Sequence, residues 1–195
     1  MEKYRSYPVD YCTGVPNITI PLYEIVAGDI TIPVSLSYHA SGLKPKERSG
    51  LAGTGWTLNL EPSIMREVKG LADSDTYGWF NTRNSPVPTD KVERLRYYNA
   101  QVDNQYDTQP DKFVYKLPHG GGSGYFLESF SPMRCIPLTN DDVRYHGTRM
   151  DITDGNGVKY EFDSVNEKAD DIITRWMCTA IRSPRQTGHP VTFEY

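Results

Sequence analysis

The chain has 195 residues and a formal net charge of −4, with no stripe of Lys and Arg, so it lacks the electrostatic footprint of a nucleic-acid-binding protein. Hydrophobic residues make up 37% of the chain and 14 tyrosines carry part of that share, so we expect a core built partly from aromatic side chains. No apolar run is long enough to span a bilayer, and the first residues lack the apolar region of a signal peptide. These features predict one β-rich domain over residues 1–195.

The clearest predicted element is a hairpin near the start of the chain. Apolar residues alternate over 18–25 and again over 30–38, on either side of the turn Ala27-Gly28-Asp29. The alternation slips by one residue at Leu22-Tyr23, as a β-bulge would produce.

A loop rich in glycine follows this hairpin. Gly53 and Gly55 can adopt positive φ, and Trp56 comes directly after them. We expect Trp56 to enter a core as a large anchor, and we expect a hairpin that joins 56–60 to 64–68. The residues of structural interest are Tyr38, Gly53, Gly55, Trp56 and Arg66.

Residues 71–111 read as an insertion of loops and one short helix. Asp90 and Glu93 have the spacing of a capping box and predict a helix over 90–101. Val92, Leu95, Tyr98 and Val102 would form its apolar stripe, so tertiary packing is expected to hold it. The aromatic residues of the insertion would either bind a glycan or protein or pack the insertion onto the sheet; they are Trp79, Phe80, Tyr97, Tyr98 and Tyr106.

Strand patterns return after the insertion. The sequence predicts a hairpin from 113–117 to 125–127 across a glycine-rich loop at 118–124, and another around 154–157. A last hairpin is expected from 172–181 to 191–195. With about ten strands, the fold class is mainly β: an antiparallel β-sandwich, or an open twisted assembly with one short helix in the insertion.

No pattern in the sequence identifies a catalytic or metal site. The run His119-Gly120-Gly121-Gly122 lacks both the G-x-S-x-G of an esterase and the Lys of a phosphate loop, so it is interpreted as a loop. Cys12, Cys135 and Cys178 do not have the spacing of zinc ligands, and we expect three free thiols. Two alternatives remain: one disulfide between two of these cysteines, or a catalytic dyad of one cysteine with a histidine. A pair of Asp or Glu residues that hydrolyses glycosides is a further alternative, because the distance between two carboxylates depends on the fold and not on the sequence pattern. We expect a non-enzymatic chain without a cofactor or metal.

The sequence contains three separated motifs, Ser37-Tyr38-His39-Ala40-Ser41-Gly42-Leu43, Gly53-Thr54-Gly55-Trp56-Thr57-Leu58-Asn59 and Ile64-Met65-Arg66. Together they resemble the N-terminal region of bacterial RHS/YD-repeat proteins, including the SpvB-type domain at the start of insecticidal toxin-complex B components. The similarity extends upstream over 11–23 and downstream over 181–184 and 192–195, while 73–107 match poorly.

The resemblance implies an exported protein, at the cell surface or secreted, whose strands build a large β-shell. It brings no catalytic residue. By this resemblance the chain is expected to be a structural module that starts or caps the shell, and its partner is expected to be the YD-repeat region that follows in the same chain. The alternative is a module that binds a surface glycan or protein through the aromatic residues of the insertion.

Overall fold

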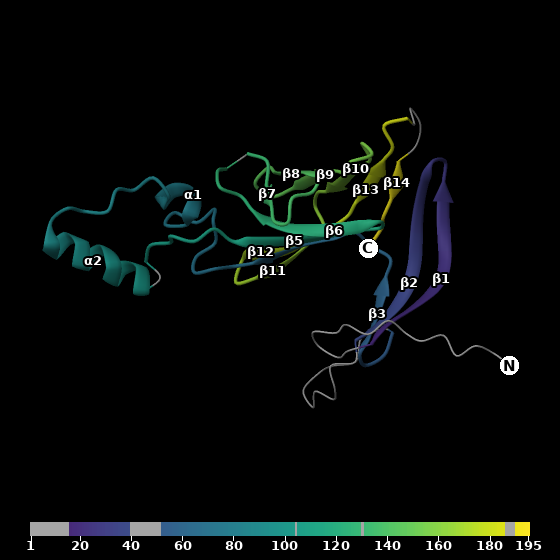
Figure 1. The fold of residues 1–195 in the computed structure, drawn as a ribbon, viewed down its shortest axis with the longest axis horizontal. Helices are drawn as coiled ribbons and strands as arrows, with labels where there is room; N and C mark the ends of the chain where they lie inside the picture. Colours follow the sequence, from purple (N-terminus) through teal and green to yellow (C-terminus); the bar gives the residue numbers. More distant parts are fainter. Residues whose placement is uncertain (1–15, 40–51, 104, 130, 186–189) are drawn as a thin grey trace. The chain divides into compact units, whose positions relative to one another are not determined.

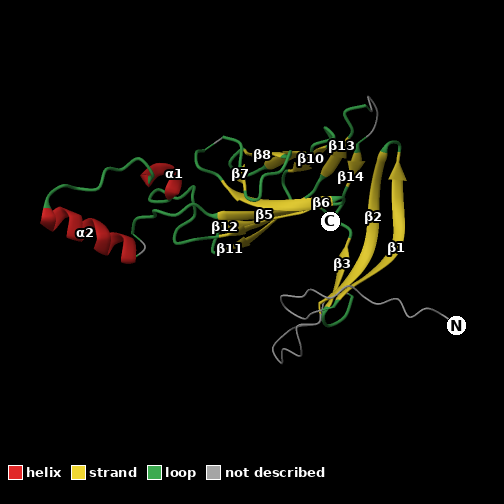
Figure 2. Cartoon of the chain, in the orientation of Figure 1, coloured by secondary structure: helices red, strands yellow, loops and turns green. Residues whose placement is uncertain are grey.

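The computed structural model describes residues 16–39, 52–103, 105–129, 131–185 and 190–195. It is mainly β, as the sequence predicted, with three antiparallel sheets and with two helices where one was expected (Figures 1 and 2). Whereas one domain was expected, the chain divides into two compact units, Met1–Glu61 and Pro62–Tyr195. Cys12, His189 and the motif residues at 11–15 and 40–43 lie outside the described residues.

The first unit contains a three-stranded sheet in the order β1-β2-β3. The predicted hairpin is confirmed: β1 (Asn17–Ala27) pairs with β2 (Ile30–His39). The predicted bulge is also confirmed, because the register shifts between Pro21 and Tyr23. The third strand, β3 (Trp56–Asn59), pairs with the other side of β2.

One face of this sheet is apolar across all three strands. Side chains on a strand alternate between faces, so residues paired across strands share a face. The resulting rows are Ile18–Tyr38–Trp56 and Ile20–Leu36–Leu58, followed beyond the bulge by Tyr23–Val34 and Ile25–Ile32. By inserting Leu22, the bulge keeps Tyr23 and Ile25 on the same face as Ile20. We call these ten residues the apolar face of the first sheet.

The predicted hairpin from 56–60 to 64–68 is wrong. β3 belongs to the first unit, whereas β4 (Ser63–Glu67) pairs with β5 (Lys112–Leu117) and β12 (Ile172–Met177) in the second. The turn signal at Glu61-Pro62-Ser63 is local, but β4 finds both of its partners far along the chain. The Pro62 carbonyl itself accepts a hydrogen bond from the Cys178 amide.

The second unit contains a six-stranded sheet, β11-β12-β4-β5-β6-β7, and a five-stranded sheet, β14-β13-β10-β9-β8. The remaining strands are β6 (Gly120–Tyr125), β7 (Arg134–Cys135), β8 (Asp142–Tyr145), β9 (Met150–Thr153), β10 (Lys159–Phe162), β11 (Asn166–Ala169), β13 (Ala180–Arg182) and β14 (Val191–Thr192). The first strand of the predicted last hairpin, 172–181, is divided between β12 and β13, which lie in different sheets, and only β13 pairs with β14.

Aromatic side chains from both sheets of the second unit form its core. Trp176 of β12 is fully buried, with its ring centroid 6.0 Å from that of Phe113 on β5 and 6.3 Å from that of Tyr145 on β8. The Trp176 indole N–H donates to the Thr148 carbonyl at 2.9 Å. The tryptophan that anchors this core is therefore Trp176, whereas Trp56, predicted as the anchor, is only half-buried.

The glycine-rich segment predicted as a loop is mostly strand. β5 and β6 are joined by a short turn at Pro118-His119, and Gly120 to Gly124 all pair with β5. A Cβ on Gly121 would lie 2.4 Å from the Tyr115 carbonyl oxygen, and one on Gly124 would lie 2.3 Å from the Arg134 carbonyl oxygen. These glycines allow neighbouring strands to approach closely. From the sequence alone, glycines with this role look the same as glycines in a flexible loop.

The hairpin predicted around 154–157 is confirmed as the pairing of β9 with β10. Its connection is longer than a two-residue primed turn, since Thr153 pairs with Lys159. The Asp154 carboxylate closes the loop by accepting from the amides of Asn156 and Val158 at 2.8 and 3.0 Å.

Candidate functional site

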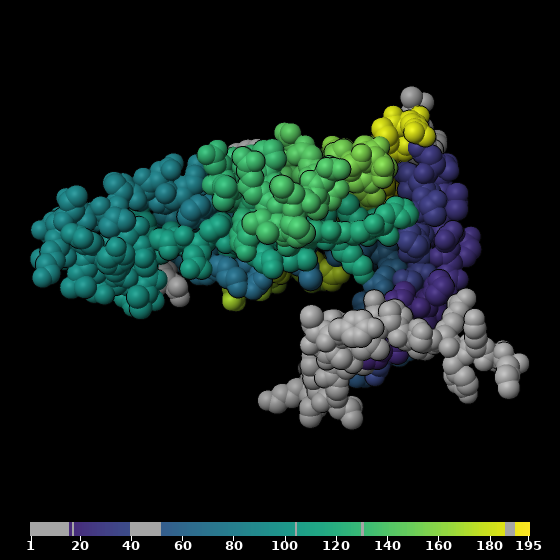
Figure 3. Space-filling view, in the orientation of Figure 1, coloured from purple at the N-terminus to yellow at the C-terminus, as the bar shows by residue number. Residues whose placement is uncertain are grey.

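The insertion predicted at 71–111 lies between β4 and β5 and contains both helices, α1 (Trp79–Thr82) and α2 (Lys91–Val102). It forms one end of the second unit (Figure 3). Its two ends meet at a buried charged cluster. We call Arg66, Asp73, Asp107 and Asp111 the base cluster.

Asp111 is the centre of the base cluster. Its fully buried carboxylate accepts from Arg66 Nε at 2.7 Å, and Arg66 Nη2 lies 2.5 Å from the same oxygen. The amides of Lys69 and Asp73 also donate to it, at 2.8 and 3.0 Å. Arg66, chosen from the sequence as a structural residue, thus compensates a buried charge that no sequence pattern indicated.

Asp73 and Asp111 bond to each other reciprocally. The Asp73 amide donates to Asp111 Oδ2, and the Asp111 amide donates to Asp73 Oδ1 at 2.9 Å. These residues lie 38 positions apart in the sequence, at opposite ends of the insertion. The exchange therefore closes the insertion at its base.

The base cluster holds more negative than positive charge. Asp73 Oδ2 and Asp107 Oδ2 are buried and have no hydrogen-bond partner among the described residues. Burial, followed by the charge of Asp111, raises the pKa of Asp73 to about 7. Burial likewise raises the pKa of Asp107, although its Oδ1 accepts from the Gln109 amide.

Helix α1 joins the insertion to the strands. The Trp79 indole N–H donates to the Leu127 carbonyl at 3.1 Å, and the Phe80 ring centroid lies 6.2 Å from that of Tyr145. Both side chains are half-buried. The contacts of Trp79 and Phe80 agree with the prediction that aromatic residues pack the insertion onto the rest of the second unit.

The start of α1 requires a glycine. A Cβ on Gly78 would lie 2.0 Å from the Ala72 carbonyl oxygen. The Thr82 hydroxyl is buried and bonds to the carbonyls of both Gly78 and Asp107, which ties α1 to the returning end of the insertion.

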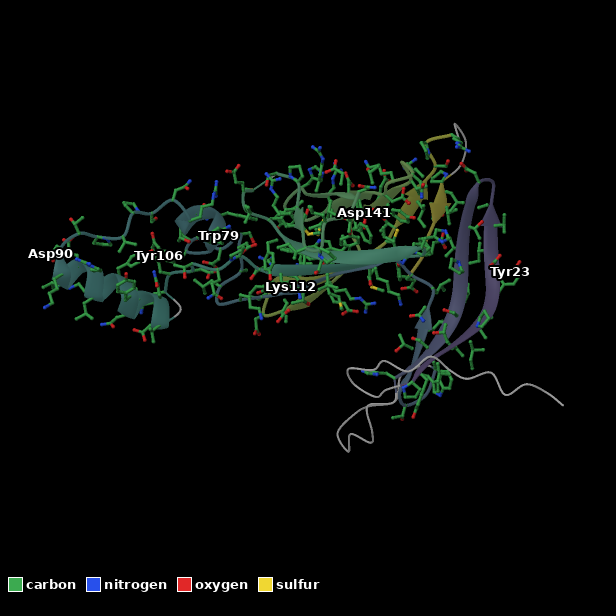
Figure 4. All side chains as sticks on the ribbon, viewed as in Figure 1. Tyr23, Trp79, Asp90, Tyr106, Lys112 and Asp141 are labelled. Carbon is green, nitrogen blue, oxygen red and sulfur yellow. The ribbon has the colours of Figure 1, made fainter. Side chains whose placement is uncertain are left out.

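Helix α2 begins as the sequence predicts. The Asp90 carboxylate accepts from the amides of Val92 and Glu93 at 2.9 and 3.0 Å, so Asp90 is the N-cap. Figure 4 marks Asp90 at the start of the helix and Tyr106 beyond its end.

The apolar stripe of α2 does not pack, contrary to our expectation. No residue of α2 is buried, and the exposed fractions of the stripe are 57% for Val92, 62% for Leu95, 47% for Tyr98 and 81% for Val102. The periodicity of the apolar residues predicted the helix correctly but did not predict that its stripe is exposed. An apolar stripe indicates a face that a partner can bury, but it does not identify the partner.

Three tyrosines of the insertion gather at α2. The Tyr97 ring centroid lies 5.7 Å from that of Tyr98 and 5.4 Å from that of Tyr106, both in edge-on geometry. Tyr97 and Tyr106 are half-buried by this packing. The structure therefore separates the four predicted binding residues into two pairs, Trp79 and Phe80 on α1 and Tyr97 and Tyr98 on α2.

The predicted motif residues of the first unit do meet. Gly53 and Gly55 have φ of 101° and 77°, which explains the choice of glycine. The Tyr38 and Trp56 ring centroids are 5.0 Å apart, and a Cβ on Gly55 would lie 2.9 Å from the Tyr38 ring. Arg66, the fifth predicted residue, belongs to the second unit.

A cavity of about 250 Å³ lies in the second unit, at the turn between β5 and β6 and the loop between β9 and β10. Its lining includes His119, Asp141, Asp154 and Tyr160. The Tyr115 hydroxyl donates to the Asp141 carboxylate, and burial raises the pKa of Tyr115. The sequence indicated Asp154 only as part of a turn, and no sequence pattern indicated Asp141.

The remaining chemistry of the described residues is limited. Cys135 and Cys178 are buried thiols. Within the ranges that the structure describes, no group of three or more His, Cys, Asp or Glu side chains is arranged to hold a metal ion. Neither α1 nor α2 has the length and hydrophobicity that a membrane crossing requires.

The chain was compared with family models, curated proteins and solved structures. None of them matches it.

Proposed function

We propose that this chain is a non-catalytic structural module of an exported RHS/YD-repeat protein, where it starts or caps a shell of β-strands. The observation that supports this proposal is the apolar face of the first sheet. The proposal assigns no catalytic residue, cofactor or metal.

Several side chains on the apolar face of the first sheet are exposed. Exposed fractions on that face reach 42% for Ile20, 45% for Leu58 and 70% for Tyr23. A sheet of three strands depends on covering a hydrophobic face for its stability. A second β-layer, packed about 10 Å away, is the usual cover for such a face.

The edge of this sheet offers a second contact for further strands. β1 is 11 residues long, and within the described part of the chain it pairs with β2 on one side only. A long strand at the edge of a sheet is a template for strand addition. In the proposed shell, strands of the YD-repeat region would cover the apolar face and extend the edge.

Adjacent substitutions on β3 test this proposal. Leu58 lies on the apolar face, whereas Thr57 points to the opposite face. We expect Leu58→Lys to leave the melting temperature of the 195-residue chain nearly unchanged, because Leu58 is exposed there. In the longer protein that contains the YD-repeat region, the same change should lower the melting temperature, and the matched control Thr57→Lys should not. Equal effects of the two variants in the longer protein would count against the proposal.

A specific observation favours a second function, the binding of a protein partner through α2. The helix is capped and amphipathic, yet its stripe of Val92, Leu95, Tyr98 and Val102 is exposed. A 12-residue helix has little intrinsic stability in water, so burial of this stripe in a partner's groove would stabilise it. Trp79 donates to the Leu127 carbonyl and Phe80 lies beside Tyr145 of β8, so a protein groove suits the site better than stacking on a glycan.

The test of this second function compares Leu95→Ser with Glu93→Ser. Both residues are exposed on α2, but only Leu95 belongs to the stripe. For a partner that binds the wild-type chain, calorimetry should show binding lost in Leu95→Ser and kept in Glu93→Ser. Binding that survives Leu95→Ser unchanged would remove α2 as the contact surface.

A further inference from the structure

The base cluster sets three carboxyl groups against one cation. Arg66 reaches in from β4, Asp107 from the returning loop and Asp111 from the residue before β5, and these are the charged groups that act on Asp73. The Arg66 guanidinium is engaged by Asp111. No second cation among the described residues contacts the Asp73 carboxyl group.

Asp73 has the least favourable environment for a negative charge. Its side chain is fully buried, and among the described residues its Oδ1 accepts only from the Asp111 amide. Its Oδ2 has no partner in the described part of the chain. A buried anionic oxygen without a donor, beside a second carboxylate, is far more costly than a neutral hydroxyl in the same place.

We propose that Asp73 carries a proton in the closed insertion and that loss of this proton opens the base of the insertion, making the base cluster a pH-sensitive release. The proton leaves Asp73 for solvent, and a second negative charge then lies beside that of Asp111. Each of the two residues donates a backbone amide hydrogen bond to the other's carboxylate, and these bonds close the insertion. Repulsion between the two carboxylates therefore pushes apart the residues that hold the insertion closed.

The electrostatics of Asp73 place the release near neutral pH. Burial and the charge of Asp111 raise its pKa to about 7, with a smaller contribution from Asp107 in the same direction. The hydrogen bond from the Asp111 amide and the charge of Arg66 oppose this shift without cancelling it.

Movement of Asp73 would also loosen the start of α1. The Phe80 amide donates to the Asp73 carbonyl at 3.1 Å, so the backbone of Asp73 supports the first turn of α1. The returning end keeps separate contacts, because the Asp107 amide donates to the Tyr77 carbonyl and the Thr82 hydroxyl to the Asp107 carbonyl. We therefore expect the leading end, near Asp73, to loosen first. This inference does not depend on whether the first sheet joins a shell.

The first measurement is a pH titration of the carboxyl ¹³C resonances by NMR in the wild-type chain. The Asp73 resonance should move with a midpoint near 7. A midpoint near the ordinary value of 3.8 would overturn the proposal. This test needs no variant, so it stands even if substitutions in the cluster prevent folding.

The second measurement follows hydrogen exchange of the Asp73 and Asp111 amides, corrected for the intrinsic effect of pH. Protection should fall between pH 6 and pH 8 in the wild type and stay constant in Asp73→Asn, which keeps an acceptor oxygen but has no proton to lose. Asp75→Asn is the matched control, since Asp75 is exposed and its carboxylate accepts only from the nearby Tyr77 amide among the described residues. It should behave as wild type. A pH-dependent loss of protection that persists in Asp73→Asn would show that another group is responsible.

Discussion

At the scale of single residues, Arg66 has the largest predicted effect on stability. Its side chain is 3% exposed and neutralises the fully buried Asp111. Removing one partner of a buried ion pair leaves an uncompensated charge, so Arg66→Met should lower the free energy of unfolding by about 3–5 kcal/mol in urea denaturation. The control is Arg144→Met, which removes an exposed pair with Asp142 and should cost less than about 1 kcal/mol. Similar losses in the two variants would contradict the compensating role of Arg66.

Asp73 gives stability a pH dependence with a defined sign. Its pKa is about 7 in the folded chain and 3.8 ordinarily, so folding favours the protonated form. The contribution of Asp73 is therefore fully present below about pH 4, decreases as pH rises toward 7, and is absent above that. The slope cannot exceed about 1.4 kcal/mol per pH unit for one group.

Urea denaturation of the wild type and Asp73→Asn at several pH values checks this sign. The difference between the two isolates Asp73 from the other acids. We expect the variant to become progressively more stable relative to the wild type from pH 4 to about pH 7, and the difference to level off above that. Parallel curves would mean that Asp73 titrates alike in the folded and unfolded chain.

At the scale of elements, β6 depends on where its glycines lie. A Cβ on Gly121 would meet the Tyr115 carbonyl, whereas one on Gly120 would meet no atom of the described residues within 4 Å. Gly121→Ala should thus destabilise the chain by about 1–3 kcal/mol, as overpacking does, while Gly120→Ala should cause no loss. Thermal unfolding of these adjacent variants provides the comparison, and equal melting temperatures would indicate that β6 does not approach β5 this closely.

The N-terminus of α2 depends on Asp90. Replacing this N-cap with Ala should cost about 0.5–2 kcal/mol of helix stability, because the amides of Val92 and Glu93 lose their acceptor. Hydrogen exchange of the α2 amides measures the loss directly. Asp103→Ala, at the other end of α2, is the control and should leave protection unchanged or raise it, since an acid is unfavourable at a helix C-terminus.

Local patterns predicted the elements better than their partners. The alternation over 18–38 and the Asp90 cap located the first hairpin and α2, because both signals depend on neighbouring residues. The same reasoning joined β3 to β4 across Pro62, although β4 pairs with β5 and β12. It also missed β7, β8 and β11, which have two to four residues each.

The candidate site was predictable only in part, for the same reason. The aromatic residues of the insertion and Arg66 stood out in the sequence. Asp73 and Asp111 did not, because a reciprocal bond across 38 positions leaves no local pattern. The exposure of Leu95 was likewise invisible, since an apolar stripe looks the same in a packed helix and in an unpartnered one.

At the scale of the whole molecule, the two units place different demands on their surroundings. The second unit buries Trp176, Phe113 and Phe162 in a core of its own. The first unit leaves apolar side chains exposed on β1 and β3, whereas Ile30 and Ile32 of β2 are buried, and β1 has no buried residue among those whose side chains are described. We therefore expect the first unit to gain more from additional strands than the second.

The most direct test compares thermal unfolding of the 195-residue chain with that of the same chain extended through the YD-repeat region proposed to follow it. Calorimetry would follow the whole transition, and hydrogen exchange of the β1 amides would report on the first sheet. The account predicts that the longer protein unfolds at a markedly higher temperature, in a transition that includes β1, with the outward amides of β1 protected. An unchanged melting temperature together with unprotected β1 amides would contradict it and leave the α2 surface as the better-supported function.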